Sequence, residues 1–251
     1  MKDYLEIWLE ITKIIASRYF IIAGITYFLF YFLLKNRLVN RKIQERFPNW
    51  KNIRLEMFYS TQAIIIFATV AMLVIKVYPG HTNMYGEISD YGWMYYFLTF
   101  PLMLVIHDTY FYWMHRAMHS RLLFRKVHLT HHRSTNPTPW ASYSFHFYEA
   151  VIEAGIIPII AFTLPVHKSA LVIFLLYQFF YNVYGHLGYE LMPKGFHKSR
   201  FGRWINTSVA HNMHHEHFKG NYGLYFLFWD RVMGTLHQEY DQRFDKLSNS
   251  K

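Results

Sequence analysis

The sequence predicts an all-α protein embedded in a membrane, a helical bundle of about four to five membrane segments with a histidine-rich cap on the cytosolic side. Three observations predict this fold class. Hydrophobic residues make up 53% of the 251 residues and charged residues only 17%, against roughly 25% charged residues in an ordinary soluble domain. The hydrophobic residues are concentrated in long uncharged runs, and sixteen histidines fall mostly in a few tight groups.

The composition also excludes several classes of protein. The chain has no cysteine, which excludes a disulfide scaffold, a cysteine nucleophile and a thiolate metal site. Its net charge of +10 is shared by many nucleic-acid-binding proteins, but 20% aromatic residues and long uncharged runs are not typical of them. We therefore expect no nucleic-acid partner and attribute the charge to basic loops beside a membrane.

The uncharged runs are the expected membrane segments. A span needs about 17–25 mainly apolar residues, and the runs at 57–75 and 169–189 meet this length. The runs at 19–34 and 91–106 are shorter and need flanking residues to span. The run at 154–166 is too short alone, so we expect it to form a hairpin with 169–189. Residues 1–18 fit either an interfacial amphipathic helix or a helical lead-in to the first segment.

The charges of the loops predict an orientation. Residues 35–56 carry seven basic and two acidic side chains, residues 114–147 carry five Lys or Arg and no acid, and residues 77–92 carry no Lys or Arg. Basic loops stay on the cytosolic side of a membrane. We therefore place 35–56 and 114–147 in the cytosol and 77–92 outside, and we interpret residues 1–251 as one membrane-embedded domain.

Three histidine groups stand out. H-x-x-H-H occurs at 128–132 and again at 211–215, and H-x-x-x-H joins His115 and His119. On a helix the positions i, i+3 and i+4 lie on one face, so each group predicts a stripe of imidazoles. Eight such imidazoles are enough for two metal ions. The isolated histidines are interpreted as ordinary surface or core residues: His81, His167, His197 and His237.

The type of ligand narrows the chemistry. Imidazole suits iron, zinc and copper, and it survives the oxidising conditions of oxygen activation. A hydrolytic zinc site usually needs about three ligands and a general base, and the H-E-x-x-H motif is absent. A zinc-dependent membrane hydrolase that uses the same histidines is the alternative. A non-catalytic metal transporter would spread its ligands along several spans.

Several motifs occur together with these groups, in a fixed order. They are Tyr112-Trp113-Met114-His115-Arg116 with His119, His128–His132, Pro137–Ser142 with Phe145-His146, His211–His215, Asn221-Tyr222-Gly223, Trp229-Asp230-Arg231 and Gly234-Thr235. Over about half the chain, residues 108–235, the sequence resembles the fatty acid hydroxylase/sterol desaturase superfamily of integral-membrane di-iron enzymes. The Pro137–Ser142 stretch is most similar to the sterol desaturase branch. Residues 1–90 would then be N-terminal membrane segments.

The resemblance implies a set of metal ligands. These are His115, His119, His128, His131, His132, His211, His214 and His215, with His186 as a further ligand near the end of the last membrane segment. Four other residues are implied as outer-shell residues or extra ligands: His107, Asp108, His146 and Asn182. Asp108 in particular is of the type that orients a ligand imidazole through its ring N–H.

The resemblance also implies the reaction and its components. Two iron ions, with zinc possible in purified protein, and O2 as co-substrate would hydroxylate or desaturate an unactivated C–H position of a lipid. The lipid would be a sterol, fatty acyl or sphingoid chain or similar. Electrons would come from an external b-type cytochrome, or from a ferredoxin with its reductase. The basic cytosolic face would attract this donor or anionic lipid headgroups. We expect a bacterial inner membrane first and the endoplasmic reticulum second; the oligomeric state is left open.

Overall fold

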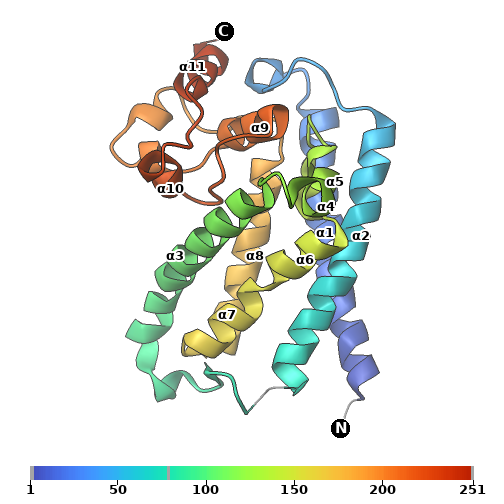
Figure 1. Cartoon of the computed structure of the whole chain (residues 1–251), viewed down its shortest axis with the longest axis vertical. Helices are drawn as coiled ribbons and strands as arrows, with labels where there is room; N and C mark the ends of the chain where they lie inside the picture. The colour runs from blue at the N-terminus through green and yellow to red at the C-terminus, as the bar shows by residue number, and fades with distance from the viewer. Residues whose placement is uncertain (1–2, 78–79, 250–251) are drawn as a thin grey trace.

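A computed structural model describes residues 3–77 and 80–249 of the chain. Four long helices form the body of the molecule: α1 (Tyr4–Phe28), α2 (Trp50–Met72), α3 (Gly92–Met118) and α8 (Lys168–Gly185). Figure 1 shows α1 and α2 side by side, with α8 in the middle and α3 inclined across it. The expected all-α class is confirmed, because the described strands are only two residues long.

Helices α1 and α2 begin at residues that cap them. The Asp3 side chain accepts a hydrogen bond from the Tyr4 amide, and Glu6 completes a capping box. Asn49 accepts from the Asn52 amide at 2.9 Å and starts α2. Such caps satisfy amide groups that have no partner inside the helix. Because α1 is continuous from Tyr4, residues 3–18 are the helical lead-in of the first segment and not a separate interfacial helix.

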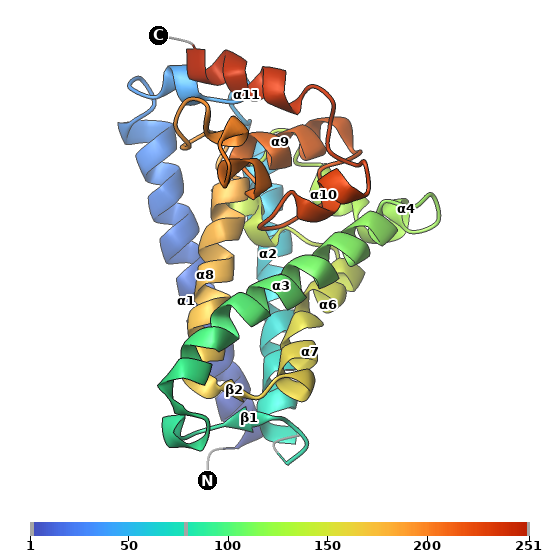
Figure 2. The same ribbon diagram turned by 90° about the vertical axis from the view of Figure 1, so that its left-hand side faces the viewer.

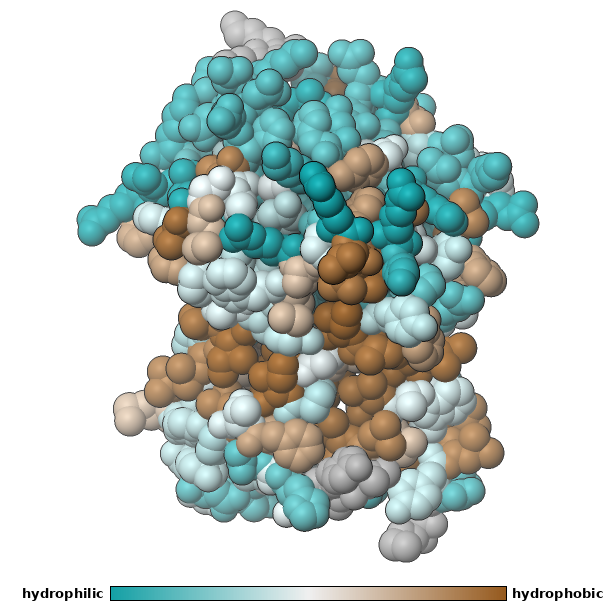
Figure 3. Space-filling view, in the orientation of Figure 1, coloured by the Kyte–Doolittle hydropathy of each residue, from teal (hydrophilic) through white to brown (hydrophobic). Residues whose placement is uncertain are grey.

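Both helices continue into a short π-helical turn, Leu29–Leu33 after α1 and Leu73–Val77 after α2. With these turns, the stretches Tyr4–Leu33 and Trp50–Lys76 are long and apolar enough to cross a membrane. Among the described residues these two helices meet that test, so the expected total of four to five segments stays a prediction. Figure 3 shows a band of hydrophobic side chains below a hydrophilic upper half of the molecule.

The expected hairpin at 154–189 is present as two helices of unequal length. Helix α7 (Ile156–Thr163) is followed by strand β2 (Val166–His167) and then by α8. Strand β2 pairs in parallel with β1 (Met84–Tyr85), so that Met84 faces Val166. Figure 2 shows this pairing at the end of the molecule that lies opposite to the C-terminal helices. The small sheet ties the turn of the hairpin to the loop that precedes α3.

The cap consists of short elements at the upper end of the long helices (Figure 1). Helices α4 (Phe124–Val127) and α5 (Leu129–His132) lie on one side. The 3-10 turn η5 (Pro139–Tyr143) leads from them to α6 (Phe147–Ala154), which packs lower down against α2. Helices α9 (Ser208–His217), α10 (Phe228–Val232) and α11 (Tyr240–Asn249) form the other side, together with the 3-10 turns Phe196–Lys198 and Gly202–Trp204. Two further 3-10 turns lie in the loops, at Val39–Arg41 and Ile88–Asp90.

Separate hydrophobic clusters hold these layers together. Met103, Ile160 and Phe174 are fully or almost fully buried between α3, α7 and α8. Met213 and Phe244 are buried where α11 packs on α9. The cap therefore has a core of its own, and α9 is held in place from the side that faces away from the long helices.

Candidate metal centre

Nine histidine side chains meet beneath the cap in two groups. Within each group the ring nitrogens that could bind an ion lie within 4.8 Å of one another. We call them the first cluster, which is His115, His119, His128, His132 and His214, and the second cluster, which is His131, His186, His211 and His215. The structure thus brings together all nine residues that the sequence nominated as ligands, including His186.

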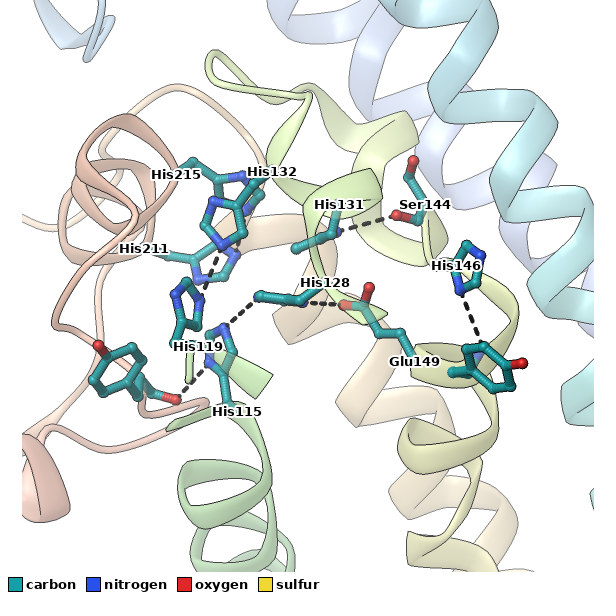
Figure 4. Close-up of polar contacts among 12 residues, drawn as sticks. His115, His119, His128, His131, His132, Ser144, His146, Glu149, His211 and His215 are labelled. Atoms are coloured by element: carbon teal, nitrogen blue, oxygen red, sulfur yellow. Dashed lines mark hydrogen bonds and ion pairs between the residues drawn. The ribbon is translucent and has the colours of Figure 1, made fainter. Parts of the chain in front are cut away.

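Each cluster is assembled from elements that are far apart in the sequence. His115 lies in the last turn of α3 and His119 is the residue that ends this helix. His186 ends α8 in the same way, while α5 and α9 supply the other histidines of both clusters. Figure 4 shows rings from the end of α3, from α5 and from α9 converging.

Each of the two H-x-x-H-H groups supplies histidines to both clusters, whereas one continuous stripe of imidazoles was expected from each group. In the 128–132 group, the first and last histidines belong to the first cluster and the fourth position of the motif belongs to the second. In the 211–215 group this assignment is reversed. A helix turns by about 100° per residue, so positions i+3 and i+4 lie on opposite sides of position i. Each motif therefore contributes rings to both clusters from one face of its segment, a division that the sequence analysis did not foresee.

Backbone carbonyl groups fix the tautomers of several rings. The Nδ1 atom of His115 donates to the Tyr222 carbonyl at 2.9 Å, and that of His214 donates to the Gly220 carbonyl at 2.7 Å. A carbonyl oxygen only accepts hydrogen bonds, so each of these neutral imidazoles carries its proton on Nδ1 and leaves a lone pair on Nε2. The Nε2 atom of His214 is buried and has no hydrogen-bond partner among the described residues.

The second cluster has the same arrangement. His186 Nδ1 donates to the Asn182 carbonyl at 2.8 Å, and His131 Nδ1 donates to the Ser144 carbonyl at 3.3 Å. The two Nε2 atoms, both without a proton, then face each other at 3.3 Å. Facing lone pairs repel, and a cation between them removes the repulsion. The donor set therefore fits a metal ion that accepts imidazole nitrogen.

Burial keeps these imidazoles in the neutral form that binds metal. It lowers the pKa of His131 and His132 well below the usual 6.5. It lowers the pKa of His119 to about 4, and this ring is the one in the first cluster that is partly exposed. Desolvation is the largest cause in each case, because charge is unfavourable in an apolar interior.

One carboxylate was missed by the sequence analysis. His128 Nδ1 lies 2.6 Å from the Glu149 carboxyl group, and Glu149 is fully buried in the first turn of α6 (Figure 4). Burial raises the pKa of Glu149 well above its usual value, and a cation on the other nitrogen of His128 would favour the carboxylate. The available signal was an acidic residue inside an otherwise apolar stretch, which marks a functional position.

The motifs Trp229-Asp230-Arg231 and Gly234-Thr235 hold the loop after α9 in place. The Asp230 carboxylate accepts hydrogen bonds from the amides of Tyr222 and Gly223 at 2.9 and 2.8 Å. It also accepts from the Thr235 hydroxyl at 2.7 Å. A Cβ atom at Gly223 would overlap the Phe226 carbonyl, so only glycine fits here. This loop carries the carbonyl groups that hold two rings of the first cluster.

The four additional candidates all lie outside the two clusters. His107 Nδ1 contacts the Tyr225 hydroxyl at 3.0 Å. Asp108 accepts from the Tyr225 amide at 2.7 Å and so holds the backbone rather than an imidazole. His146 caps α6. The Asn182 side chain donates to the Ser142 carbonyl at 2.7 Å, while its own backbone carbonyl orients His186.

The histidines that were interpreted as ordinary residues also lie outside the clusters. His81 is exposed. His167 hydrogen-bonds to the Gly86 carbonyl at 2.7 Å beside the small sheet. The His197 ring packs on Phe244, and the His237 ring stacks on His217. The spacing of histidines in the sequence therefore separated eight of the cluster members from these residues, and the family resemblance added His186.

Long apolar helices beneath a cap with two buried histidine clusters are the features of a membrane protein built around a histidine-rich metal site. Comparison with known families agrees with this class. The model of the fatty acid hydroxylase family matches residues 100–235, more than half of the chain. The chain belongs to the fatty acid hydroxylase family.

Curated relatives place the chain in the sterol desaturase branch. Lathosterol oxidase of Rattus norvegicus is 32% identical over 72% of this chain and 60% of its own length. The Delta(7)-sterol 5(6)-desaturase of Gibberella zeae is 29% identical over 91% of this chain and 62% of its own. Human lathosterol oxidase is 29% identical over 86% of this chain and 70% of its own. The match thus spans less than two thirds of the rat and fungal proteins, and no solved structure matches.

Proposed function

We propose that the chain is an oxygen-dependent membrane oxidoreductase that uses two iron ions to desaturate or hydroxylate an unactivated C–H position of a sterol-like lipid. The observation that carries this proposal is the pair of histidine clusters, with Nδ1 protons held by carbonyl groups and Nε2 lone pairs converging. The names of the relatives favour desaturation of a sterol.

Each cluster would hold one iron ion. Bound iron supplies the one-electron and oxygen chemistry that side chains alone cannot provide. The chain contributes the orientation of the rings through the acceptors on Nδ1, which raises the basicity of the ligands. It also excludes water, because eight of the nine rings are buried. Glu149 holds the Nδ1 proton of His128 at 2.6 Å.

The substrate would approach from the apolar side of the second cluster. A cavity of about 240 Å³ lies there, and most of its lining is apolar. Phe145 forms part of this lining, and its ring lies 5.1 Å from the ring of His131. A lipid in this cavity would contact Phe145, whose ring packs on a histidine of the second cluster.

The electrons would come from a separate donor, a b-type cytochrome or a ferredoxin with its reductase. Desaturation takes two hydrogens from the lipid and reduces O2 to two waters with two further electrons and two protons. The open surface at His119 carries Arg121 and Arg125, and positive charge favours an acidic partner. The basic loops support a cytosolic position for this surface.

Metal analysis tests the proposal directly. The protein is purified anaerobically in detergent, its metals are measured by plasma mass spectrometry, and His214→Ala is the control. About two irons per chain, fewer in the variant, together with oxygen-dependent conversion of a sterol, are the expected results. Zinc at full occupancy without iron uptake under ferrous conditions would replace this proposal with a membrane hydrolase. Absence of any stoichiometric metal would overturn both.

A further inference from the structure

The apolar cavity beside the second cluster is built from six helices. Its walls come from α1, α2, α3, α8 and the α6–α7 pair, and from Tyr143 and Phe145. Three residues at its lower end, Ile14, Ile75 and Val172, are 66%, 44% and 66% exposed. The cavity therefore opens at this end toward the hydrophobic band of the surface. At about 240 Å³ it holds part of a lipid, since pockets for whole drug-sized ligands measure roughly 300–1,000 Å³.

Its polar side chains gather at the other end. In α1 the lining residues are Ile11, Ile14, Ile15 and Arg18, in α8 they are Val172, Leu175 and Gln178, and along α6–α7 they are Glu153, Ala154, Ile156 and Ile157. In each series the polar residue lies nearest to the clusters: α8 runs on to His186, and α6 begins at His146. The cavity is thus polar beside the metal centre and apolar away from it.

Glu153 is the residue that links this polar end to the metal centre. It follows Glu149 by one helical turn, a rise of about 6 Å along the axis. Glu149 itself contacts His128 at 2.6 Å. The Glu153 side chain lines the cavity and is only partly buried. A group bound to Glu153 therefore lies close to the clusters.

The polar end is only partly satisfied within the protein. Arg18 donates one hydrogen bond to the Tyr143 hydroxyl at 2.7 Å, whereas its Nε atom is buried without a partner among the described residues. Glu153 and Gln178 line the cavity without a side-chain hydrogen bond to another of the described residues. Polar groups in an apolar pocket are unfavourable unless a hydrogen bond compensates them. The set combines an acid, a base and an amide. A substrate carboxylate would face Glu153 and an amine would face Arg18, so a neutral hydroxyl, which both donates and accepts, is the matching group.

We propose that the lipid enters this cavity with its polar end first, and that Glu153, with Gln178, is a specificity-determining residue that binds a hydroxyl group of the substrate. The reacting C–H position then lies within a few bonds of that hydroxyl, and the hydrocarbon tail extends through the lower opening into the membrane. A sterol meets this description, because its hydroxyl lies on a terminal ring and its tail at the opposite end. The inference rests on the proposed function, because that function identifies the histidine clusters as the place where the C–H position reacts.

The test is a binding measurement that needs no turnover. Radiolabelled cholestanol, and cholestane, which is the same hydrocarbon without the hydroxyl, are bound to the full chain in nanodiscs. We expect the wild type to prefer cholestanol roughly 2- to 10-fold, the range for a hydrogen bond to a neutral group. Glu153→Leu should remove this preference while cholestane binding is kept. Glu153→Gln, which still accepts a hydrogen bond, should retain part of it.

One control and one further variant separate a binding effect from a folding effect. Glu87→Gln changes an exposed carboxylate at the far end of the molecule and should leave the preference intact. Gln178→Leu alters the same polar end from α8, so it should also weaken the preference and serves if Glu153→Leu does not fold. The inference is overturned if Glu153→Leu keeps the preference for the hydroxyl. It is also overturned if Gln178→Leu and Glu153→Gln both keep this preference at wild-type strength.

The outcomes separate the inference from the proposed function. Turnover is measured on the same samples with ferrous iron, oxygen and a chemical reductant. A wild-type enzyme that converts sterols while Glu153→Leu keeps its hydroxyl preference would leave the function standing and remove the inference. Hydroxyl-dependent binding that is lost in Glu153→Leu, without any oxygen-dependent turnover, would support the binding role and remove the function.

Discussion

The first and second clusters draw on the same two sequence motifs but sit in different surroundings. The first cluster has five rings, one of them the partly exposed His119, and a carboxylate on His128. The second has four buried rings, with His131 and His186 held by backbone carbonyls. The first borders a basic surface and the second borders the apolar cavity. The comparison teaches that the same motif supplies histidines to both clusters, whereas the neighbouring segments decide what each cluster faces.

The largest effect should come from removing one ring from each cluster. His214→Ala in the first cluster and His211→Ala in the second should each lower the iron content from about two to about one per chain. Both should reduce lipid conversion to the level of protein without iron, because each ion needs its own ligands. Plasma mass spectrometry of the two variants checks this. Loss of both irons in either variant would mean that the clusters act as one cooperative site.

The carboxylate that distinguishes the first cluster provides the second prediction. Glu149→Gln keeps the shape of the side chain but removes its charge, so the iron of the first cluster should bind about 10- to 100-fold more weakly, the usual loss when an outer-shell partner is changed. Competition with a chelator measures this affinity. Glu87→Gln is the matched control. Equal weakening of both irons would contradict a role limited to the first cluster.

The loop after α9 holds two rings of the first cluster, and a substitution at Asp230, which is not a member of either cluster, should destabilise this loop. Asp230→Asn removes charge from the acceptor of the Tyr222 and Gly223 amides. The free energy of unfolding should fall by about 1–3 kcal/mol, as for a lost hydrogen bond to a charged group. Denaturant unfolding in detergent measures it, with the exposed Asp241→Asn as control. An unchanged unfolding free energy would show that the loop is held by other contacts.

The smallest expected effect is the loss of iron at low pH. Burial lowers the pKa of His119 from 6.5 to about 4, so this ring stays neutral, and able to bind metal, until the pH falls through about 4. In the metal-free protein, the stability that this ring contributes above pH 6.5 is lost between pH 6.5 and about 4. We expect iron release to begin near pH 4 at the first cluster, whose ring His119 is reached by solvent. Release of iron first from the buried second cluster would contradict the expected difference in solvent access between the two clusters.

The sequence indicated eight of the clustered histidines because their spacing is local and unusual, and the family resemblance added His186. The structure gathers all nine, while the role of each as a metal ligand stays a prediction. Glu149 and the division of each motif between two clusters were missed, because both depend on how α5, α6 and α9 pack together. For the start of α1, the structure selects the helical lead-in from the two alternatives left open by the sequence, because a capping box at Asp3 begins the helix there.

The facing nitrogens of His131 and His186 have a consequence for the life of the protein in a cell. Without a metal ion, their lone pairs meet at 3.3 Å in a buried space, so the empty cap is less stable than the loaded one. Metal binding and folding are then linked. If the clusters hold iron as proposed, a shortage of iron would leave more newly made chains unfolded and open to degradation. The amount of this protein would then follow the iron supply.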